Sequence, residues 1–188
     1  MTTTIVRSSS DNHQSASDDT GVASRWRRPV TWLIVVAVLH AASPLIVLGA
    51  HWWFGIDETV YLSQINGHVP AAGFSAPRAR GTTFIAAPVT LLTTSVSAVR
   101  IWVSALSGLG LFVAFQPWLR LRSGNVAPLA ALMFATVWSV IFYGFAVMPN
   151  EWVALAALAA CGYLLRFLST GQRRYLVGVG IAMALVAL

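Results

Sequence analysis

Acidic side chains are scarce in this chain. Only six of its 188 residues are Asp or Glu, and three of those lie within the first 28 residues. The other three are Asp57, Glu58 and Glu151. Ionisable groups in an apolar chain are costly, so their presence predicts a functional site. The adjacent pair Asp57-Glu58 is therefore the first candidate for chemistry.

Lysine is absent, and all twelve basic residues are arginines. They are scattered at the ends of hydrophobic runs, whereas nucleic-acid-binding proteins gather basic residues on a solvated face. We therefore expect no nucleic-acid partner. The single cysteine, Cys161, excludes an internal disulfide.

Charged residues make up 10% of the sequence and apolar residues 57%. The mean hydropathy is +0.71. These values exclude an ordinary water-soluble domain and are typical of an integral membrane protein.

The first 28 residues differ from the rest, because they are rich in Ser, Thr and Asp and have few large apolar side chains. Such a segment cannot bury enough surface to fold, so residues 1–28 are predicted to be a disordered tail and residues 29–188 a transmembrane domain. The apolar run 30–54 is long enough to cross a hydrocarbon core of ~30 Å. A cleaved signal peptide is the alternative, but no small-x-small cleavage site follows.

Four further apolar runs cover residues 99–119, 126–147, 152–168 and 175–188. The sequence thus predicts an all-α, polytopic transmembrane helix bundle with about five spans. The last run has 14 residues, fewer than the ~20 that a crossing needs. We expect the chain to be truncated at its C-terminus, as the first part of a longer membrane protein.

The arginines predict the orientation, because cytoplasmic loops carry an excess of basic residues. A cytoplasmic N-terminus leaves only Arg78, Arg80 and Arg100 outside. The nine arginines inside are then Arg7, Arg25, Arg27, Arg28, Arg120, Arg122, Arg166, Arg173 and Arg174. This distribution predicts a multi-pass protein of a bacterial cytoplasmic membrane, with residues 55–98 as an extracytoplasmic loop. Residues 84–98 are too short for a span and contain Pro88, so we expect them to lie at the interface or to dip partway into the membrane against other helices.

A short surface helix is predicted over residues 58–66, since apolar residues at 61, 62 and 65 share one face. Asp57 would be its N-cap, which is the structural explanation for this acid. The functional explanation is that an acid at the membrane surface accepts a proton from a substrate hydroxyl. Glu151 has the same two explanations, as a second acid or as a group that stabilises a helix N-terminus. His40 lies within a predicted span, so we expect it to be neutral and hydrogen-bonded.

The order of these features resembles a known family. A first span is followed by Gly-Ile-Asp57-Glu58-x-x-Tyr61, by a surface helix, and by Ser75-Ala-Pro77-Arg78-Ala-Arg80-Gly81. This arrangement is similar to the amino-terminal part of GT-C type glycosyltransferases, the mannosyltransferase branch above all. These multispanning enzymes take a sugar from a polyprenyl-phosphate carrier. The resemblance extends over residues 30–188 in layout but only over Asp57-Glu58 in motif.

The resemblance implies a role for the outer loop. Asp57, and with less support Glu58, would be the catalytic base that deprotonates a hydroxyl of a lipid or glycan acceptor. Arg78 and Arg80 would bind the donor phosphate, for which guanidinium groups are well suited; alternatively they only contact lipid headgroups. The transferred sugar is a hexose or a pentose, and inversion of the anomeric centre is expected.

Two questions stay open at the level of sequence. No group of residues has the spacing of a metal site, so no metal ligand is predicted, although an acidic pair leaves a divalent cation as an open alternative for the cofactor. The second question is whether the protein is an enzyme. A non-enzymatic membrane protein, either a transporter fragment or a scaffold, would use Asp57 only as a helix cap and the arginines only as anchors.

Overall fold

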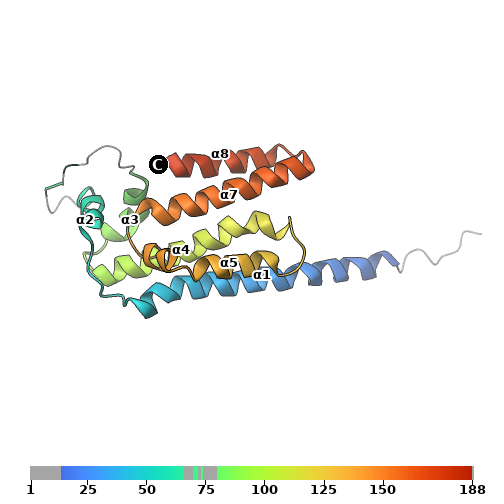
Figure 1. The fold of residues 1–188 in the computed structure, drawn as a ribbon, viewed down its shortest axis with the longest axis horizontal. Coiled ribbons are helices and arrows are strands. Elements are labelled where there is room, and N and C mark those ends of the chain that lie inside the picture. Colours follow the sequence, from blue (N-terminus) through green and yellow to red (C-terminus); the bar gives the residue numbers. More distant parts are fainter. Residues whose placement is uncertain (1–13, 66–69, 72, 74–79, 188) are drawn as a thin grey trace, which may run out of the picture.

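The computed structural model describes residues 14–187, except for 66–69, 72 and 74–79, and describes side chains from Arg28 onward. The described residues form eight α-helices and no β-strand (Figure 1). The prediction of an all-α protein is confirmed. The helices are α1 (Gln14–Val47), α2 (Ile56–Ser63), α3 (Gly81–Thr90), α4 (Val96–Leu119), α5 (Val126–Ala135), α6 (Trp138–Tyr143), α7 (Pro149–Thr170) and α8 (Arg174–Ala187).

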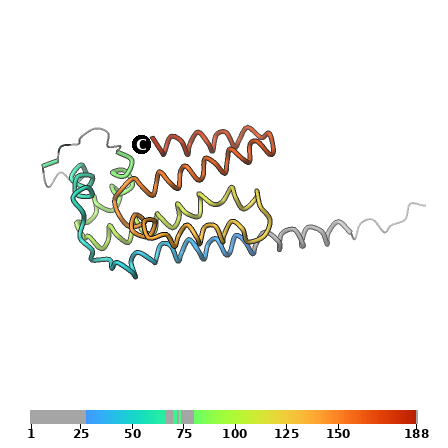
Figure 2. Tube along the Cα trace, in the orientation of Figure 1, coloured from blue at the N-terminus to red at the C-terminus, as the bar shows by residue number. Residues whose placement is uncertain are grey.

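Three helices are long and apolar enough to cross a membrane, namely the Arg28–Val47 part of α1, α4 and α7. Two shorter apolar helices, α5 and α8, lie beside them. These five helices run back and forth along a common direction (Figures 1 and 2). The described part of the chain thus has three candidate membrane spans, and the count of five spans remains a prediction.

The apolar run 126–147 does not form the single helix that we predicted. α5 ends at Ala135, and Val137 is extended with φ −67° and ψ 126° before α6 begins. After α6 the backbone is again non-helical up to Met148, which is also extended. Non-helical backbone at membrane depth is stable only where protein groups satisfy its polar atoms. Between α6 and α7, the buried side chains of Glu58 and Arg100 bond to two of these polar atoms.

α1 and α4 pack closely because α4 has no side chain at Gly108. A Cβ atom at this position would lie 2.6 Å from the carbonyl oxygen of Ala37 and 2.8 Å from the Cβ of Ala41. Small residues at helix contacts allow this close approach in membranes. α7 and α8 form a hairpin, in which Gly171 adopts the left-handed conformation (φ 69°) that ends α7.

α1 begins at Gln14, so part of the predicted disordered tail is helical. Once a helix has formed in an apolar span, further residues join its end at a low cost in free energy, because the unfavourable nucleation step is already complete. Residues 1–13 lie outside the described part of the chain.

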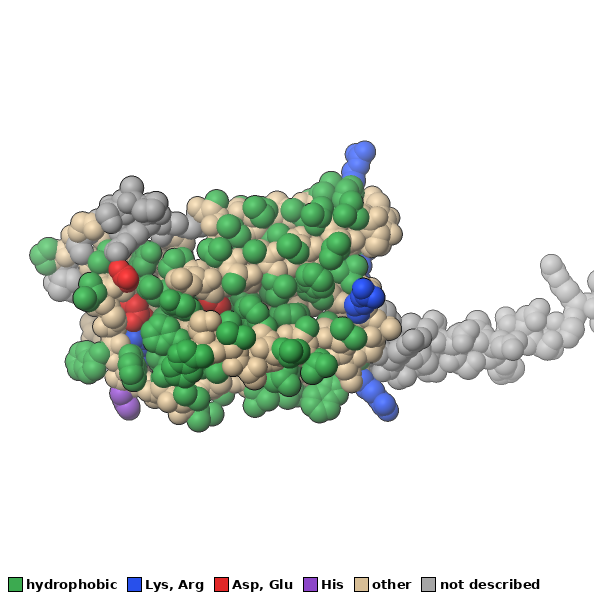
Figure 3. Space-filling model, viewed as in Figure 1, with side chains coloured by type: hydrophobic (Ala, Val, Ile, Leu, Met, Phe, Trp, Pro, Cys, Tyr) green, Lys and Arg blue, Asp and Glu red, His purple; other side chains and the backbone are tan. Residues whose placement is uncertain are grey.

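The described acidic side chains lie toward one end of the bundle, and most of the described arginines lie at the other end (Figure 3). Figure 3 shows arginine side chains at the end of the bundle from which the N-terminal segment leaves, and acidic side chains toward the other end. The acids whose side chains are described are Asp57, Glu58 and Glu151, in α2 and in the first turn of α7. This segregation agrees with an orientation in which the arginine-rich end is cytoplasmic.

Candidate functional site at one end of the bundle

Asp57 is exposed on α2, which lies at the end of the bundle opposite the arginine-rich end (Figures 1 and 3). It is not the N-cap that we predicted, because α2 begins at Ile56 and its N-cap is Gly55. The prediction failed because the carboxylate three residues after the N-cap belongs to Glu58. Glu58 Oε2 accepts the backbone N–H of Gly55 at 2.8 Å, which is the half of a capping box that needs no N-cap side chain. Asp57 is thus not required to cap this helix.

Glu58 points into the protein and is only 7% exposed. Its carboxylate receives two hydrogen bonds from Arg100, of 2.5 and 2.9 Å. Its Oε1 also accepts the backbone N–H of Val147 at 2.7 Å. Four donors from three parts of the chain therefore share this one carboxylate. A group engaged in this way holds structure together and is poorly placed to take a proton from a substrate.

Arg100 is the partner that sequence reasoning missed, because we treated it only as an outer anchor. It is 1% exposed. Besides Glu58, it donates to the carbonyl oxygens of Phe145 (2.9 Å), Trp53 (3.0 Å) and Trp52 (3.3 Å). Its guanidinium carbon lies 4.4 Å from the ring centre of Phe145 and 4.8 Å from that of Phe54. A charge buried in an apolar segment needs such partners, and that requirement was the available sequence signal.

The Glu58–Arg100 pair explains the break between α6 and α7. Arg100 donates to the carbonyl of Phe145, and the N–H of Val147 donates to Glu58, so two polar backbone groups of the non-helical segment are satisfied. The same pair fixes α2 to α4. The rigid placement of α2 in turn fixes the position of its exposed neighbour Asp57.

The two predicted phosphate-binding arginines cannot both be located. Arg78 lies outside the described residues. Arg80 is exposed and is the N-cap residue of α3. α3 packs against α2 and α4, so Arg80 lies at the same end of the protein as Asp57.

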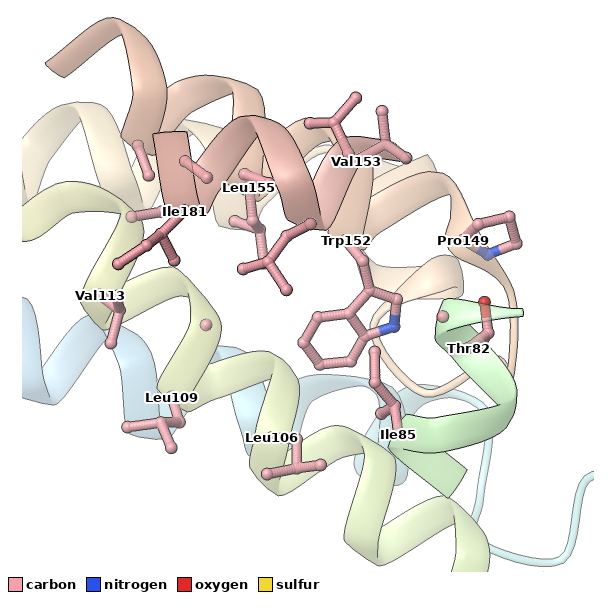
Figure 4. Close-up of a pocket in the computed structure, with 18 of the residues that line it drawn as sticks. Thr82, Ile85, Leu106, Leu109, Val113, Pro149, Trp152, Val153, Leu155 and Ile181 are labelled. Carbon is pink, nitrogen blue, oxygen red and sulfur yellow. The ribbon is translucent and has the colours of Figure 1, made fainter. Parts of the chain in front are cut away.

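An apolar groove of about 600 Å³ lies between α3, α4, α7 and α8 (Figure 4). Leu106 and Leu109 of α4, Leu155 of α7 and Ile181 of α8 are among its lining residues. At the α3 end Figure 4 shows Thr82 near Pro149, with the ring of Trp152 reaching from α7 toward α3. The indole Nε1 of Trp152 is buried without a described hydrogen-bond partner. The groove is therefore apolar along its length and carries polar groups near the end that faces α3.

Glu151, the predicted possible second acid, is buried in a cluster with His40 and Ser107. Glu151 Oε1 lies 2.8 Å from His40 Nε2 and accepts the Ser107 hydroxyl at 2.7 Å. Ser107 Oγ is also 2.9 Å from His40 Nε2. The side chains of His40 and Glu151 are 0% exposed. The expectation that His40 is hydrogen-bonded is confirmed.

This cluster is not a nucleophilic Ser-His-acid triad. In such a triad the serine and the acid bind different nitrogens of the imidazole ring. Here the Ser107 hydroxyl and the Glu151 carboxylate both contact Nε2 of His40, and among the described residues Nδ1 has no partner. The cluster joins α1, α4 and α7 inside the bundle, and the side chains of His40 and Glu151 are fully buried there.

Metal binding has no support from the described part of the chain. No group of three or more His, Cys, Asp or Glu side chains comes close enough to hold an ion there. Asp57 and Glu58 are adjacent in sequence but point in different directions, one to solvent and one into the core.

Among the carboxylates that the structure describes, only that of Asp57 is exposed. It lies on a rigidly held helix, at the end of the bundle that also carries Arg80. Comparisons with protein-family models, with curated proteins and with solved structures give no match to this chain.

Proposed function

We propose that this chain is part of a membrane glycosyltransferase of the GT-C type, which moves a sugar from a polyprenyl-phosphate donor to an extracytoplasmic lipid or glycan acceptor. The observation that carries the proposal is the separation of two neighbouring acids. Glu58 is occupied by Arg100 and two backbone N–H groups, while Asp57 is exposed on the same short helix. A base must have access to its substrate, and a fixed helix positions it.

The apolar groove supports a lipid-linked donor. An isoprenoid chain is long and apolar, and the groove offers it a surface along α4, α7 and α8. The phosphate would lie near α3, where Arg80, the hydroxyl of Thr82 and the N–H of Trp152, which has no partner among the described residues, provide polar groups. Arg78 belongs to the same proposal as a second phosphate ligand.

The chemistry assigns one task to each group. Asp57 accepts the proton of the acceptor hydroxyl while the oxygen of that hydroxyl attacks the anomeric carbon of the sugar. The bond between that carbon and the carrier phosphate breaks, and the electron pair leaves with the phosphate. Arginine stabilises the negative charge that grows there. The transferred sugar ends with an inverted anomeric configuration.

The topology of the proposal places Asp57 outside the cell. The N-terminus is cytoplasmic, α5 with α6 crosses as one segment, and α8 forms the fifth crossing of a bacterial cytoplasmic membrane. The arginine-rich end then faces the cytoplasm, in accord with the positive-inside rule.

A second candidate function comes from another observation. The buried His40–Ser107–Glu151 cluster places ionisable groups inside the spans, as transporters do along their substrate or proton paths. In a transporter or scaffold, Asp57 would have no catalytic task.

The experiment is replacement of Asp57 by Asn in the protein expressed at its native length in cells. Because general-base catalysis contributes ~10²-fold or more, D57N should reduce sugar incorporation into envelope glycolipid by at least that factor. Membrane insertion should be unchanged. The matched control is Thr59→Ala, at another exposed position of α2, which should retain incorporation. Retained incorporation in D57N would remove Asp57 as the base and favour the second candidate.

A further inference from the structure

Two arginines converge on one tyrosine at the end of the α7–α8 hairpin that lies far from Asp57. Arg166 of α7 and Arg174 of α8 both donate a hydrogen bond to the hydroxyl of Tyr175. Their guanidinium carbons lie 4.1 and 5.1 Å from the centre of the Tyr175 ring. Tyr175 is 7% exposed. The tyrosine thus holds two positive charges next to each other at the end of the bundle.

A third arginine adds to this charge. Arg120, the residue that follows α4, is close enough to Arg166 to repel it electrostatically, as is Arg174. We call Arg120, Arg166, Arg174 and Tyr175 the arginine cluster. The described acidic side chains lie in α2 and in the first turn of α7, so none of them neutralises this end.

The guanidinium groups have donors to spare. Each has five N–H groups, and the hydrogen bonds found for Arg166 and Arg174 in the described part of the chain use only one nitrogen of each. Like charges held together with free donors are stabilised by an anion. Guanidinium groups bind phosphate oxygens in pairs.

The location indicates which anion this is. The cluster lies where apolar helices end, which is the level of lipid headgroups. Beside it, the side chains of Leu168 (70% exposed) and Val177 (63% exposed) face outward from α7 and α8. A lipid can place its phosphate on the arginines and its acyl chains along these apolar faces. A soluble phosphate compound has no acyl chain to pack against this apolar surface.

We propose that the arginine cluster binds the phosphate of an anionic phospholipid of the cytoplasmic leaflet. This leaflet carries the negative surface charge that attracts basic residues. The site lies at the opposite end from Asp57 and does not depend on the glycosyltransferase proposal.

The test measures the thermal unfolding midpoint of the purified full chain in detergent, titrated with phosphatidylglycerol, with phosphatidylcholine or with inorganic phosphate. Phosphatidylglycerol should raise the midpoint, and the other two should not. The double variant R166Q/R174Q should weaken the apparent affinity for phosphatidylglycerol by about tenfold or more, as expected for the loss of charge-assisted hydrogen bonds.

The matched control is R122Q. Arg122 is exposed two residues after Arg120 and has no described contact with Tyr175. An equal loss of affinity in R122Q would show general electrostatic attraction and overturn the site. Stabilisation by inorganic phosphate to the same extent would assign the cluster to a soluble anion and overturn the lipid proposal.

A second variant keeps the test decisive if the double variant does not fold. Tyr175→Phe retains the ring but removes the hydroxyl that both arginines contact. It should weaken the effect of phosphatidylglycerol while R122Q does not. An unchanged effect in Y175F would contradict the proposed geometry.

Discussion

Replacement of Glu58 by Gln should destabilise the protein far more than the neighbouring replacement of Asp57 by Asn. Gln has nearly the same shape as Glu but no charge, and its amide nitrogen would face donors of Arg100, Gly55 or Val147. Arg100 would remain buried, at 1% exposure, without a counter-charge. Loss of one partner of a buried ion pair costs about 3–5 kcal/mol. Asp57 is exposed, and surface substitutions usually change stability by less than about 0.5 kcal/mol.

The size of the effect is large relative to the total stability of a folded protein, which is about 5–15 kcal/mol. Reversible unfolding of E58Q, D57N and the wild type in mixed micelles would measure the three free energies. A free energy of unfolding for E58Q within about 0.5 kcal/mol of the wild type would refute the structural role of Glu58.

A double-mutant cycle separates the ion pair from the other contacts of Arg100. Arg100→Met removes the charge and leaves the carbonyl of Phe145 without its donor, which costs about 1–3 kcal/mol. The double variant E58Q/R100M should be more stable than the sum of the two single losses predicts, by about 2 kcal/mol, because no unpaired charge is left. Additive losses would show that Glu58 and Arg100 are not coupled.

The same unfolding assay checks two further predictions. Glu151→Leu removes the acceptor of Ser107 and the partner of His40, and should lower the free energy of unfolding by about 1–3 kcal/mol. When His40 is also replaced by Leu, the total loss should be smaller than the sum of the two single losses. Additive losses would argue against the cluster. Gly108→Ala should cost about 1–3 kcal/mol because its Cβ would overlap the backbone of α1, whereas the control Gly180→Ala, with nothing within 4 Å, should cost nothing.

The sequence was sufficient to predict the long apolar helices, because each needs only its own run of apolar residues. α4 and α7 begin and end within three residues of the predicted bounds. The break between α6 and α7 was not predictable in this way. Two of its polar backbone atoms are satisfied by Glu58 and Arg100, which are far away in sequence.

The candidate site shows the same limit. Scarcity of carboxylates drew attention to Asp57, Glu58 and Glu151, but it could not show which of them are buried. The capping role of Glu58 could have been inferred, since it stands three residues after Gly55, the glycine just before the helix. Its pairing with Arg100, and the pairing of Glu151 with His40 and Ser107, depend on helix packing that no local pattern encodes.

The side of the membrane on which α2 lies tests the central claim most directly, because a polyprenyl-phosphate sugar is used by this site only if Asp57 faces outward. A single cysteine would be introduced at Thr59, exposed on α2, or at Ser123, exposed at the arginine-rich end, in a chain with Cys161→Ala. A membrane-impermeant thiol reagent added to intact cells should label the cysteine at position 59. It should label the one at position 123 only after permeabilisation. The reverse pattern would place Asp57 in the cytoplasm and contradict the proposed function.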